Sequence, residues 1–396
     1  MFPMRKAVPG CTLERPGINA TVRGVGRPRP QYDVVIVGAG PGGGIAACRL
    51  AAHDVSVLIV DRQVLPRPKA CGGALPSRVR SLVDCDLDPL IEARVWSQVF
   101  LFDFNESPEV QQTSEPTLFV ERERFDHYFV GRALSTGSGR VALRQDLFIK
   151  QAREDEEGVT LTASSGEVIR CRYVIAADGA SSHIARSIGL FRTPAGAAID
   201  ATVSLTSETF DRERDRATFN LNCVPAGYGW TFPKRTHLSC GVGSWRSPKV
   251  LASKLRTFLA RTFSPGSITT WSMRAHLVPV FQGHRQVATA RICLVGDAAH
   301  LVDPVVGEGI IYALESGKIA GDVVAALCAA ERSHVVARRE LDRLSTEAGW
   351  RQPAPRNPDC RFYDGAIRFG VARHLNLIRL AAKSHPHPYY RNLVAD

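Results

Sequence analysis

Three glycines near the start of the chain have the clearest chemical meaning. Gly38, Gly40 and Gly43 follow the spacing G-x-G-x-x-G. In this motif the first glycine makes a tight turn, the second lets the backbone approach a pyrophosphate, and the third lets a helix pack closely on a strand. Asp61 follows at roughly the 20-residue distance at which an acidic side chain accepts hydrogen bonds from a ribose 2′-OH. These residues predict a site for a dinucleotide.

The elements that must position this motif stand on either side of it. Val34 to Val37 are an apolar, β-branched run typical of a parallel strand covered on both faces, and Pro41 to Ala52 are rich in helix formers. A second apolar run, Val55 to Val60, ends at Asp61. A glycine-rich turn that binds nothing is the alternative, but the strand, the helix and the distal acid together favour nucleotide binding.

Two further strands are expected to end in an acidic tip. Tyr173 to Ala177 precede Asp178-Gly179, and Arg291 to Val295 precede Gly296-Asp297. Because the carboxyl ends of parallel strands meet at one edge of a sheet, we expect the three tips to converge on a large, extended cofactor. Asp297 suits hydrogen bonding to the ribityl or phosphate part of such a cofactor, and capping of a helix N-terminus is the alternative.

A second glycine turn precedes a long helical stretch that we expect to reach about Leu344. The turn contains Gly307, Gly309 and Ile310. Backbone N–H groups and the positive end of the helix can face an anion there, and for a flavin that anion would be the reduced ring. The first glycine turn would suit NAD equally well, but this distant segment makes FAD the better occupant.

A constrained loop, Pro66 to Pro76, contains the most reactive candidate. Cys71 is followed by Gly72 and Gly73, which remove side chains where something must come close, and Lys69 stands two positions before it. A cysteine thiol of ordinary acidity is mostly protonated at neutral pH and can serve as a proton source. The alternative is a small, buried apolar residue.

An aromatic stretch could face a substrate. Tyr228, Trp230 and Phe232 alternate along an expected strand and therefore share one face. They would form a broad apolar wall for a flat ring or an isoprenoid chain, or else a part of the core.

Composition narrows the function classes. The chain has 396 residues, 44% hydrophobic and 22% charged, with a net charge of +11 and ten scattered cysteines without a C-x-x-C pair. We expect a reducing compartment, no metal site and no nucleic-acid partner, because neither zinc spacing nor a nucleic-acid-binding module is present. No apolar run is long enough to cross a bilayer, so we expect no integral membrane protein. We expect a cytoplasmic location and favour a monomer over an oligomer. A peripheral membrane contact is the alternative, through the basic amphipathic segment Ile367 to Lys383.

Four stretches together resemble one family. They are the glycine motif, Lys69-Ala-Cys71-Gly72-Gly73, Pro225-Ala-Gly-Tyr228-Gly-Trp230-Thr-Phe232-Pro233, and Gly296-Asp297 with Gly307-Glu308-Gly309-Ile310. From Tyr32 to about Leu327 the chain resembles the geranylgeranyl reductase family of FAD-dependent oxidoreductases, which have the p-hydroxybenzoate hydroxylase fold. The resemblance implies that Asp61 holds the adenosine ribose, that Arg122 contacts FAD, and that Cys71 protonates the substrate. An exposed charge at a helix start is the alternative for Arg122.

The resemblance also implies a reaction. We expect reduction of C=C bonds in a geranylgeranyl or other prenyl chain, by hydride from FADH2 and a proton from Cys71. NAD(P)H or ferredoxin would supply the electrons without a Rossmann domain of its own, because no second nucleotide fingerprint is present. His300, where hydroxylases often have histidine, keeps a flavin-dependent monooxygenase or halogenase open. A non-catalytic prenyl-lipid binding flavoprotein is a further alternative.

The expected fold class is α/β and α+β, with a Rossmann-like FAD-binding domain and an inserted β-rich substrate domain. We expect a basic, disordered tail at 1–31. The FAD-binding domain would comprise 32–98, 118–190 and 285–345, and the substrate domain 99–117 and 191–284. A helical segment, 346–396, would end the chain.

Overall fold

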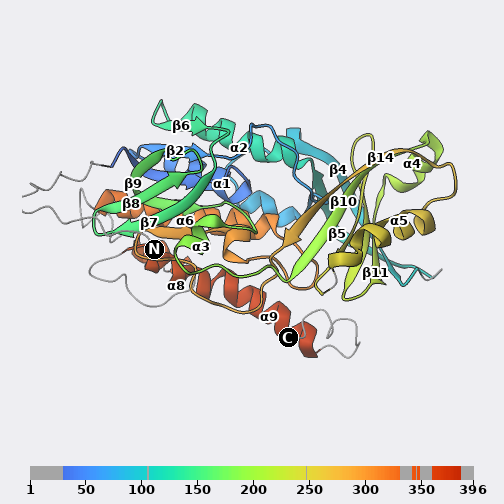
Figure 1. Cartoon of the computed structure of the whole chain (residues 1–396). Coiled ribbons are helices and arrows are strands. Elements are labelled where there is room, and N and C mark those ends of the chain that lie inside the picture. The colour runs from blue at the N-terminus through green and yellow to red at the C-terminus, as the bar shows by residue number, and fades with distance from the viewer. Residues whose placement is uncertain are drawn as a thin grey trace, which may run out of the picture.

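Runs of apolar residues form two β-sheets, which lie side by side in Figure 1. The structure is a computed structural model, and it describes residues 30–104, 107–246, 248–330, 341–344, 346–347 and 359–384. The expected tail therefore lies almost entirely outside the described residues, and so do residues 331–340 of the long helical stretch.

The first sheet consists mainly of short, apolar strands that are buried on both faces. Its parallel strands are, in spatial order, β6 (Val141–Arg144), β2 (Val57–Val60), β1 (Tyr32–Val37), β9 (Val168–Ala176) and β15 (Ile292–Leu294). The antiparallel strands β8 (Gly158–Ala163) and β7 (Ile149–Asp155) continue from β9. The parallel strands β1, β9 and β15 are neighbours, so their carboxyl ends meet at one edge, as the sequence predicts.

Three helices pack beside this sheet and beside one another. They are α1 (Pro41–Ala51), α2 (Arg122–Thr136) and α6 (Ile310–Ala330). Helix α1 contacts both of the others, and glycines make these contacts close. A Cβ at Gly317 of α6, for example, would lie 2.2 Å from the carbonyl oxygen of Gly42.

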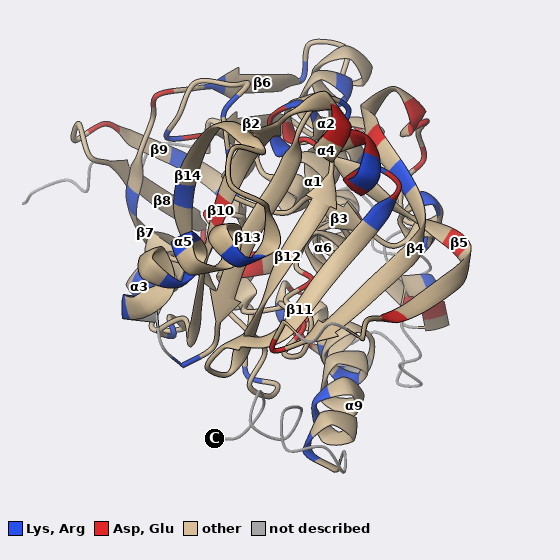
Figure 2. Cartoon of the chain, turned by 90° about the vertical axis from the view of Figure 1, so that its right-hand side faces the viewer, with Lys and Arg blue, Asp and Glu red and all other residues tan. Residues whose placement is uncertain are grey.

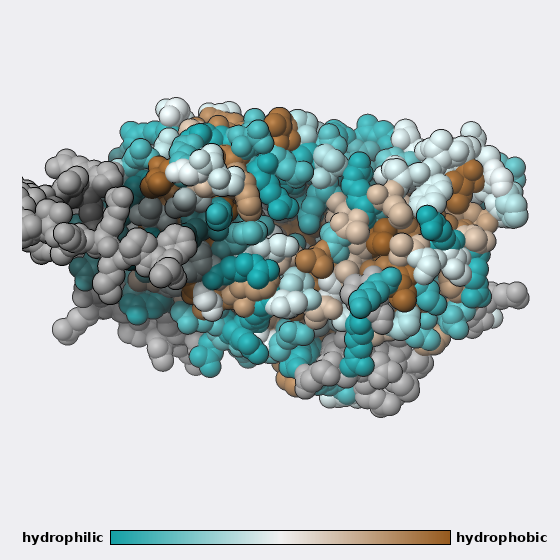
Figure 3. All heavy atoms as spheres, in the orientation of Figure 1, coloured by the Kyte–Doolittle hydropathy of each residue, from teal (hydrophilic) through white to brown (hydrophobic). Residues whose placement is uncertain are grey.

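The second sheet, at the right of Figure 1, is long and largely antiparallel. Its strands are, in spatial order, β14 (Ile268–Val278), β10 (Gly196–Leu205), β13 (Leu238–Ser244), β12 (Gly227–Pro233), β11 (Arg216–Val224), β4 (Ile91–Phe102), β5 (Glu109–Val120) and β3 (Ala74–Leu75). Helix α5 (Leu251–Thr262) packs on β10 and β13. In Figure 3, hydrophobic residues reach the surface at this end of the molecule among hydrophilic ones.

Several strand boundaries differ from the predictions. Strand β4 begins at Ile91 and β5 ends at Val120, so residues expected with the nucleotide-binding sheet belong to the second sheet. Charged residues alternate with apolar ones at the start of β4, which hides the strand from a search for apolar runs. A single strand was expected over residues 144–150, but Asp146 has a φ of +54° and separates β6 from β7. The division into domains remains a prediction.

The remaining helices are short or C-terminal. The short ones are α3 (His183–Ser187), α4 (Ser207–Glu213) and the 3-10 turns η1 (Ser77–Ser81), η2 (Asp88–Leu90), η3 (Pro248–Val250) and η4 (Gly296–Ala299). The single helix expected over Ile367 to Lys383 is divided at Gly370 into α8 (Arg361–Phe369) and α9 (Val371–Ser384). Among the described residues, no helix is long and apolar enough to cross a membrane.

Candidate active site

A deep cleft opens where the three acidic strand tips converge. Its empty space is about 1290 Å³, counted with its open mouth. Most of the residues that the sequence singles out line it: Gly38, Gly40, Asp61, Cys71, Arg122, Asp178, Asp297, Gly307, Gly309 and Ile310. Gly43, Gly72 and the aromatic residues Tyr228, Trp230 and Phe232 are not among the lining residues. The structure thus brings together segments that are far apart in the sequence.

A side chain would meet different surroundings at each of the three glycines of the first turn. Gly38 has a φ of +105°, and a Cβ there would lie 2.2 Å from the carbonyl oxygen of Ala177. A Cβ at Gly43 would lie 1.9 Å from the carbonyl oxygen of Gly38, so the helix and the turn can be this close only without a side chain. A Cβ at Gly40 would meet only the far end of Arg67, 3.9 Å away. The space beside Gly40 is therefore open to a ligand.

Helix α1 presents free backbone donors to this space. Its N-cap is Gly40, and no side chain caps the helix. The first N–H groups of an α-helix have no partner inside the helix, and the positive end of its dipole attracts anions. A pyrophosphate beside Gly40 would meet both effects.

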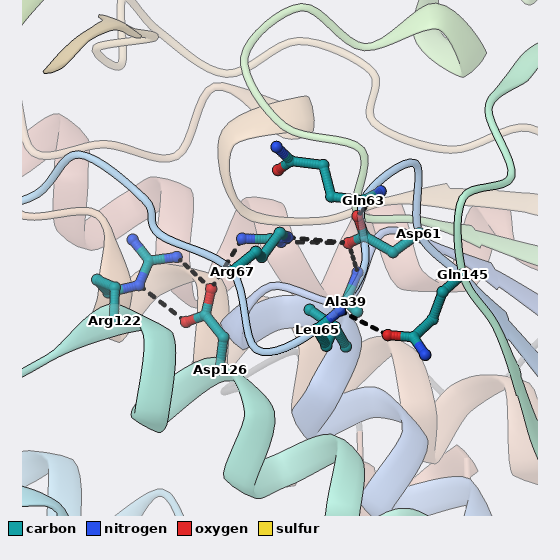
Figure 4. Close-up of polar contacts among 8 residues, drawn as sticks. All are labelled: Ala39, Asp61, Gln63, Leu65, Arg67, Arg122, Asp126 and Gln145. Atoms are coloured by element: carbon teal, nitrogen blue, oxygen red, sulfur yellow. Dashed lines mark hydrogen bonds and ion pairs between the residues drawn. The ribbon is translucent and has the colours of Figure 1, made fainter.

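Asp61 lies at the cleft wall and is held by several donors, as Figure 4 shows. One carboxylate oxygen accepts from the backbone N–H of Ala39 at 2.9 Å and from Arg67 at 3.2 and 3.3 Å. The other accepts from the N–H of Gln63 at 2.9 Å. These bonds fix the carboxylate at the end of β2, and its contact with a ribose remains a prediction.

Arg122 is buried at the start of α2, which excludes the exposed-charge alternative. Its guanidinium donates two hydrogen bonds to Asp126, at 2.8 and 2.9 Å. Figure 4 shows Arg67 between Asp126 and Asp61, with Arg122 on the far side of Asp126. Burial alone would lower the pKa of Arg122, but Asp126 and Cys71 outweigh it and raise the pKa, so the guanidinium stays charged.

The two other acidic tips differ in their surroundings. Asp178 accepts from the N–H groups of His183 and Ile184 through one oxygen, at 2.8 and 3.2 Å. Its other oxygen is buried without a partner among the described residues, and burial raises the pKa of the group. Asp297 lies inside η4, whose N-cap is Val295, so the helix-capping alternative for Asp297 is wrong.

The Cys71 loop lies between the cleft and the aromatic residues. Cys71 is half-buried, lines the cleft, and accepts at Sγ from the N–H of Gly73 at 3.4 Å. A Cβ at Gly72 would lie 2.8 Å from the ring of Phe232 and 3.2 Å from the indole nitrogen of Trp230. Gly72 therefore allows the loop to rest directly on the aromatic wall.

The aromatic wall itself is packed. Tyr228, Trp230 and Phe232 are 9%, 5% and 5% exposed, and the rings of Trp230 and Phe232 stack with centroids 6.1 Å apart. The hydroxyl of Tyr228 donates to the carbonyl oxygen of Val306, in the second glycine turn. In this structure the three residues are core beneath the Cys71 loop, and their contact with a substrate remains a prediction.

The sequence missed several residues of the cleft. Arg67 and His276 line it, and the Nδ1 atom of His276 is buried without a partner among the described residues. Burial first, and then Lys69 and Arg122, lower the pKa of His276 to about 3, so the ring is neutral. Nothing in the sequence around His276 signals a site. Asp126, by contrast, could have been found from its four-residue spacing to Arg122 on an expected helix.

The cleft fits FAD. It offers an uncapped helix end with open space at Gly40, a buried carboxylate oxygen on Asp178, a neutral ring on His276, and a second glycine turn before α6. A dinucleotide needs anion-binding backbone groups at its centre and polar partners along its length. The lining residues provide both.

Comparisons with known proteins agree with this fit. Residues 31–327 match the FAD binding domain family. The chain is 31% identical to digeranylgeranylglycerophospholipid reductase 1 of Methanopyrus kandleri. The aligned segment has 331 residues and covers 80% of this chain and 87% of that protein.

Two solved structures share the fold. A geranylgeranyl bacteriochlorophyll reductase-like protein from Thermoplasma acidophilum matches with a TM-score of 0.66 and 21% identity, over 92% of this chain and 96% of that one. Halogenase PltM matches with a TM-score of 0.64 and 16% identity, over 92% and 94% of the two chains. At these identities the likeness shows the fold alone. From the extent of the sequence matches, the chain belongs to the FAD binding domain family and, within it, to the geranylgeranyl reductase family of FAD-dependent oxidoreductases.

Proposed function

We propose that this protein reduces C=C bonds of a geranylgeranyl or other prenyl chain, with FAD as its cofactor. The observation that carries the proposal is the position of Cys71, a half-buried thiol on the wall of the FAD cleft, in a loop that rests on an aromatic wall. The similarity to digeranylgeranylglycerophospholipid reductase 1 supports the substrate class.

Reduction of a C=C bond needs a hydride donor at one of its carbons and a proton donor at the other. When bound and reduced, FAD supplies a hydride. An isolated C=C bond has no group that stabilises the resulting charge, so a proton must reach the second carbon. The Sγ of Cys71 gives that proton from the cleft wall. Arg122 lies near Cys71, which is one of the groups that raise the pKa of Arg122, so a positive charge stands beside the thiol.

The test is substitution of the thiol. Cys71→Ala and Cys71→Ser should retain FAD and lose roughly 100- to 10,000-fold in kcat on geranylgeranyl diphosphate or a digeranylgeranyl phospholipid, because a positioned acid is missing. Cys85→Ala is the matched control, since Cys85 is also partly exposed but does not line the cleft. Wild-type turnover in both Cys71 variants would disprove the role.

The proposal includes the electron donor. NAD(P)H or ferredoxin reduces FAD, and this protein uses no second nucleotide-binding domain for the donor. The pair Gly241 and Gly243 lies inside strand β13 and not in a turn between a strand and a helix, which supports the absence of a second dinucleotide turn at that place. Stopped-flow reduction by each donor, followed at the flavin absorbance, distinguishes the two.

A monooxygenase or halogenase is the rival on the same fold, which halogenase PltM shares. His300, which suggested this rival, is buried and does not line the cleft. Burial lowers the pKa of His300 to about 4, so the ring is neutral. Its position gives the rival no support. Dependence on oxygen separates the two reactions.

We further propose that helix α9 makes a peripheral membrane contact. Leu377 and Leu380 are 57% and 56% exposed on this helix. Arg373, Arg379 and Lys383 lie on it as well, and Figure 2 shows basic residues along its length. Exposed leucines beside basic residues suit an anionic lipid surface, from which a prenyl lipid could reach the protein.

A further inference from the structure

A buried lysine lies directly behind the Cys71 loop. Lys234 follows the last residue of β12 and is 3% exposed. Its Nζ donates to the carbonyl oxygens of Gly72 and Val120, each at 2.8 Å, and lies 5.6 Å from the centre of the Phe119 ring. No carboxylate forms an ion pair with it within 4.0 Å among the residues that the structure describes.

The burial of this ammonium group needs an explanation. Taking a charge out of water is costly unless hydrogen bonds and opposite charges replace the water. Burial lowers the pKa of Lys234, and the charges of Glu121, Cys71 and Asp200 act against it. A methionine or leucine would fill the same space without this cost, but neither donates the hydrogen bonds that the Nζ of Lys234 gives to the two carbonyl groups.

Both carbonyl groups belong to segments that carry site residues. Gly72 directly follows Cys71, and Val120 stands two positions before Arg122. The ammonium group therefore joins the Cys71 loop to the junction of β5 and α2. A Cβ at Gly73 would lie 2.1 Å from the carbonyl oxygen of Val120 and 2.7 Å from the Nζ of Lys234. A glycine at this position leaves room for the bridge.

The residues beneath the loop are themselves held in place. The hydroxyl of Ser239 donates to the carboxyl group of Asp200, on β10, at 2.5 Å, and the indole N–H of Trp230 donates to Ser239 at 3.3 Å. A Cβ at Gly72 would lie 3.2 Å from this indole nitrogen. The second sheet thus presents a fixed surface to the loop, and the Nζ of Lys234 fastens the loop to it.

We propose that Lys234 is a positioning residue that fixes the Cys71 thiol on the cleft wall beside Arg122. Its two hydrogen bonds tie the carbonyl group next to Cys71 to the junction of β5 and α2, and so restrain the rotation by which the loop could withdraw Sγ. The catalytic meaning of the clamp rests on the proposed function of Cys71, whereas the clamp itself can be measured without substrate.

The holoenzyme of Lys234→Met carries the first test. Hydrogen–deuterium exchange of the peptide that spans residues 69–76 should become about ten-fold faster, because both carbonyl anchors are lost. The kcat should fall about 10- to 100-fold with KM and FAD content within about two-fold of wild type, because misplacement of a catalytic group by a small distance affects the reaction more than binding. Lys150→Met, at an exposed lysine of β7, is the control and should match wild type in every measurement.

A second variant keeps the test decisive if Lys234→Met fails to retain FAD. Lys234→Gln keeps a side-chain N–H donor on a shorter side chain, so it should speed exchange of the same peptide by less than Lys234→Met does. Unchanged exchange in either variant overturns the clamp. If exchange rises as expected but Cys71→Ala retains wild-type turnover, the proposed function fails and the clamp stands.

Discussion

The thiol of Cys71 lies near two buried basic side chains, those of Arg122 and Lys234. Arg122 and Lys234 are 8% and 3% exposed, and each is held by oxygen atoms of the protein rather than by water. Fixed charges in a water-poor site act more strongly on a nearby reacting group than solvated ones. The two fixed side chains therefore act on the Cys71 thiol at one position in the cleft wall.

Asp200 gives this site a pH dependence of stability. Burial is the main cause that raises its pKa to about 6, against a usual value of 3.8, while Ser239, Lys234 and the N–H of Cys71 oppose the rise and Glu121 adds to it. The folded protein therefore binds more protons than the unfolded chain between these values, and its stability falls as the pH rises through them.

The expected loss in the free energy of unfolding is on the order of 1 to 3 kcal/mol between pH 4 and pH 6.5. Asp200→Asn should remove most of this loss, because the amide does not ionise. Urea unfolding of the holoenzyme at the two pH values measures it. An equal difference in the variant and in wild type would show that Asp200 is not the group responsible.

The sequence predicts which residues belong to the site where a local motif contains them. The glycines of both turns, Cys71 and Arg122 all line the cleft or support it, since their motifs are local in sequence. Lys234 and His276 were not predictable as site residues, because each reaches the site through contacts between segments that are distant in the chain. Lys234 bonds to Gly72 and Val120, and His276 lies on β14, which pairs with β10. A single lysine after a strand carries no signal of its burial.

At the scale of elements, the first helix depends on its close approach to the turn before it. Gly43→Ala places a Cβ against the carbonyl oxygen of Gly38, a backbone atom that cannot move aside without shifting the turn. We expect a loss of at least about 2 kcal/mol in stability and weaker FAD binding.

Gly131→Ala is the matched control for that variant. Gly131 is exposed within α2, and a Cβ there would have nothing within 4 Å. Replacing a helical glycine at an unstrained position should stabilise the protein by about 0.4 to 1 kcal/mol. Thermal unfolding of the two variants, with and without FAD, tests the contrast, and a Gly43→Ala variant as stable as wild type would contradict the packing argument.

Helix α9 carries its own prediction. A Leu377→Ser, Leu380→Ser double variant should bind vesicles of anionic phospholipid several-fold more weakly than wild type, because the exposed apolar contact is lost. Val168→Ser, at a 55% exposed valine of β9, is the control and should bind as wild type does. Cosedimentation gives the measurement, and equal binding of the double variant would place the contact elsewhere or exclude it.

The elements themselves were largely predictable. The strand β1, the glycine turn after it, the helix α1 and the strand β2 lie where the patterns predict them. Strand β4 was recognised only in part because charged side chains occupy its exposed positions, and the division between α8 and α9 at Gly370 was missed within one amphipathic pattern. Such boundaries depend on packing, which a local pattern does not contain.

At the scale of the whole molecule, two sheets cooperate at one cleft. The first sheet contributes the glycine turn and the acidic tips, and the second contributes the aromatic wall, Lys234 and Asp200 behind the Cys71 loop. The first half of this arrangement follows from the rule that parallel strands bind ligands at their carboxyl ends. The second half follows from an antiparallel sheet whose strand order the sequence does not reveal.

The central claim is a reduction that needs no oxygen. The most direct test is to reduce the holoenzyme photochemically under strict exclusion of oxygen and then add geranylgeranyl diphosphate or a digeranylgeranyl phospholipid. We predict that the absorbance of oxidised flavin returns and that mass spectrometry finds hydrogen added to the prenyl chain. Flavin that stays reduced until oxygen is admitted, with oxygen then found in the product, would contradict the account and favour a monooxygenase.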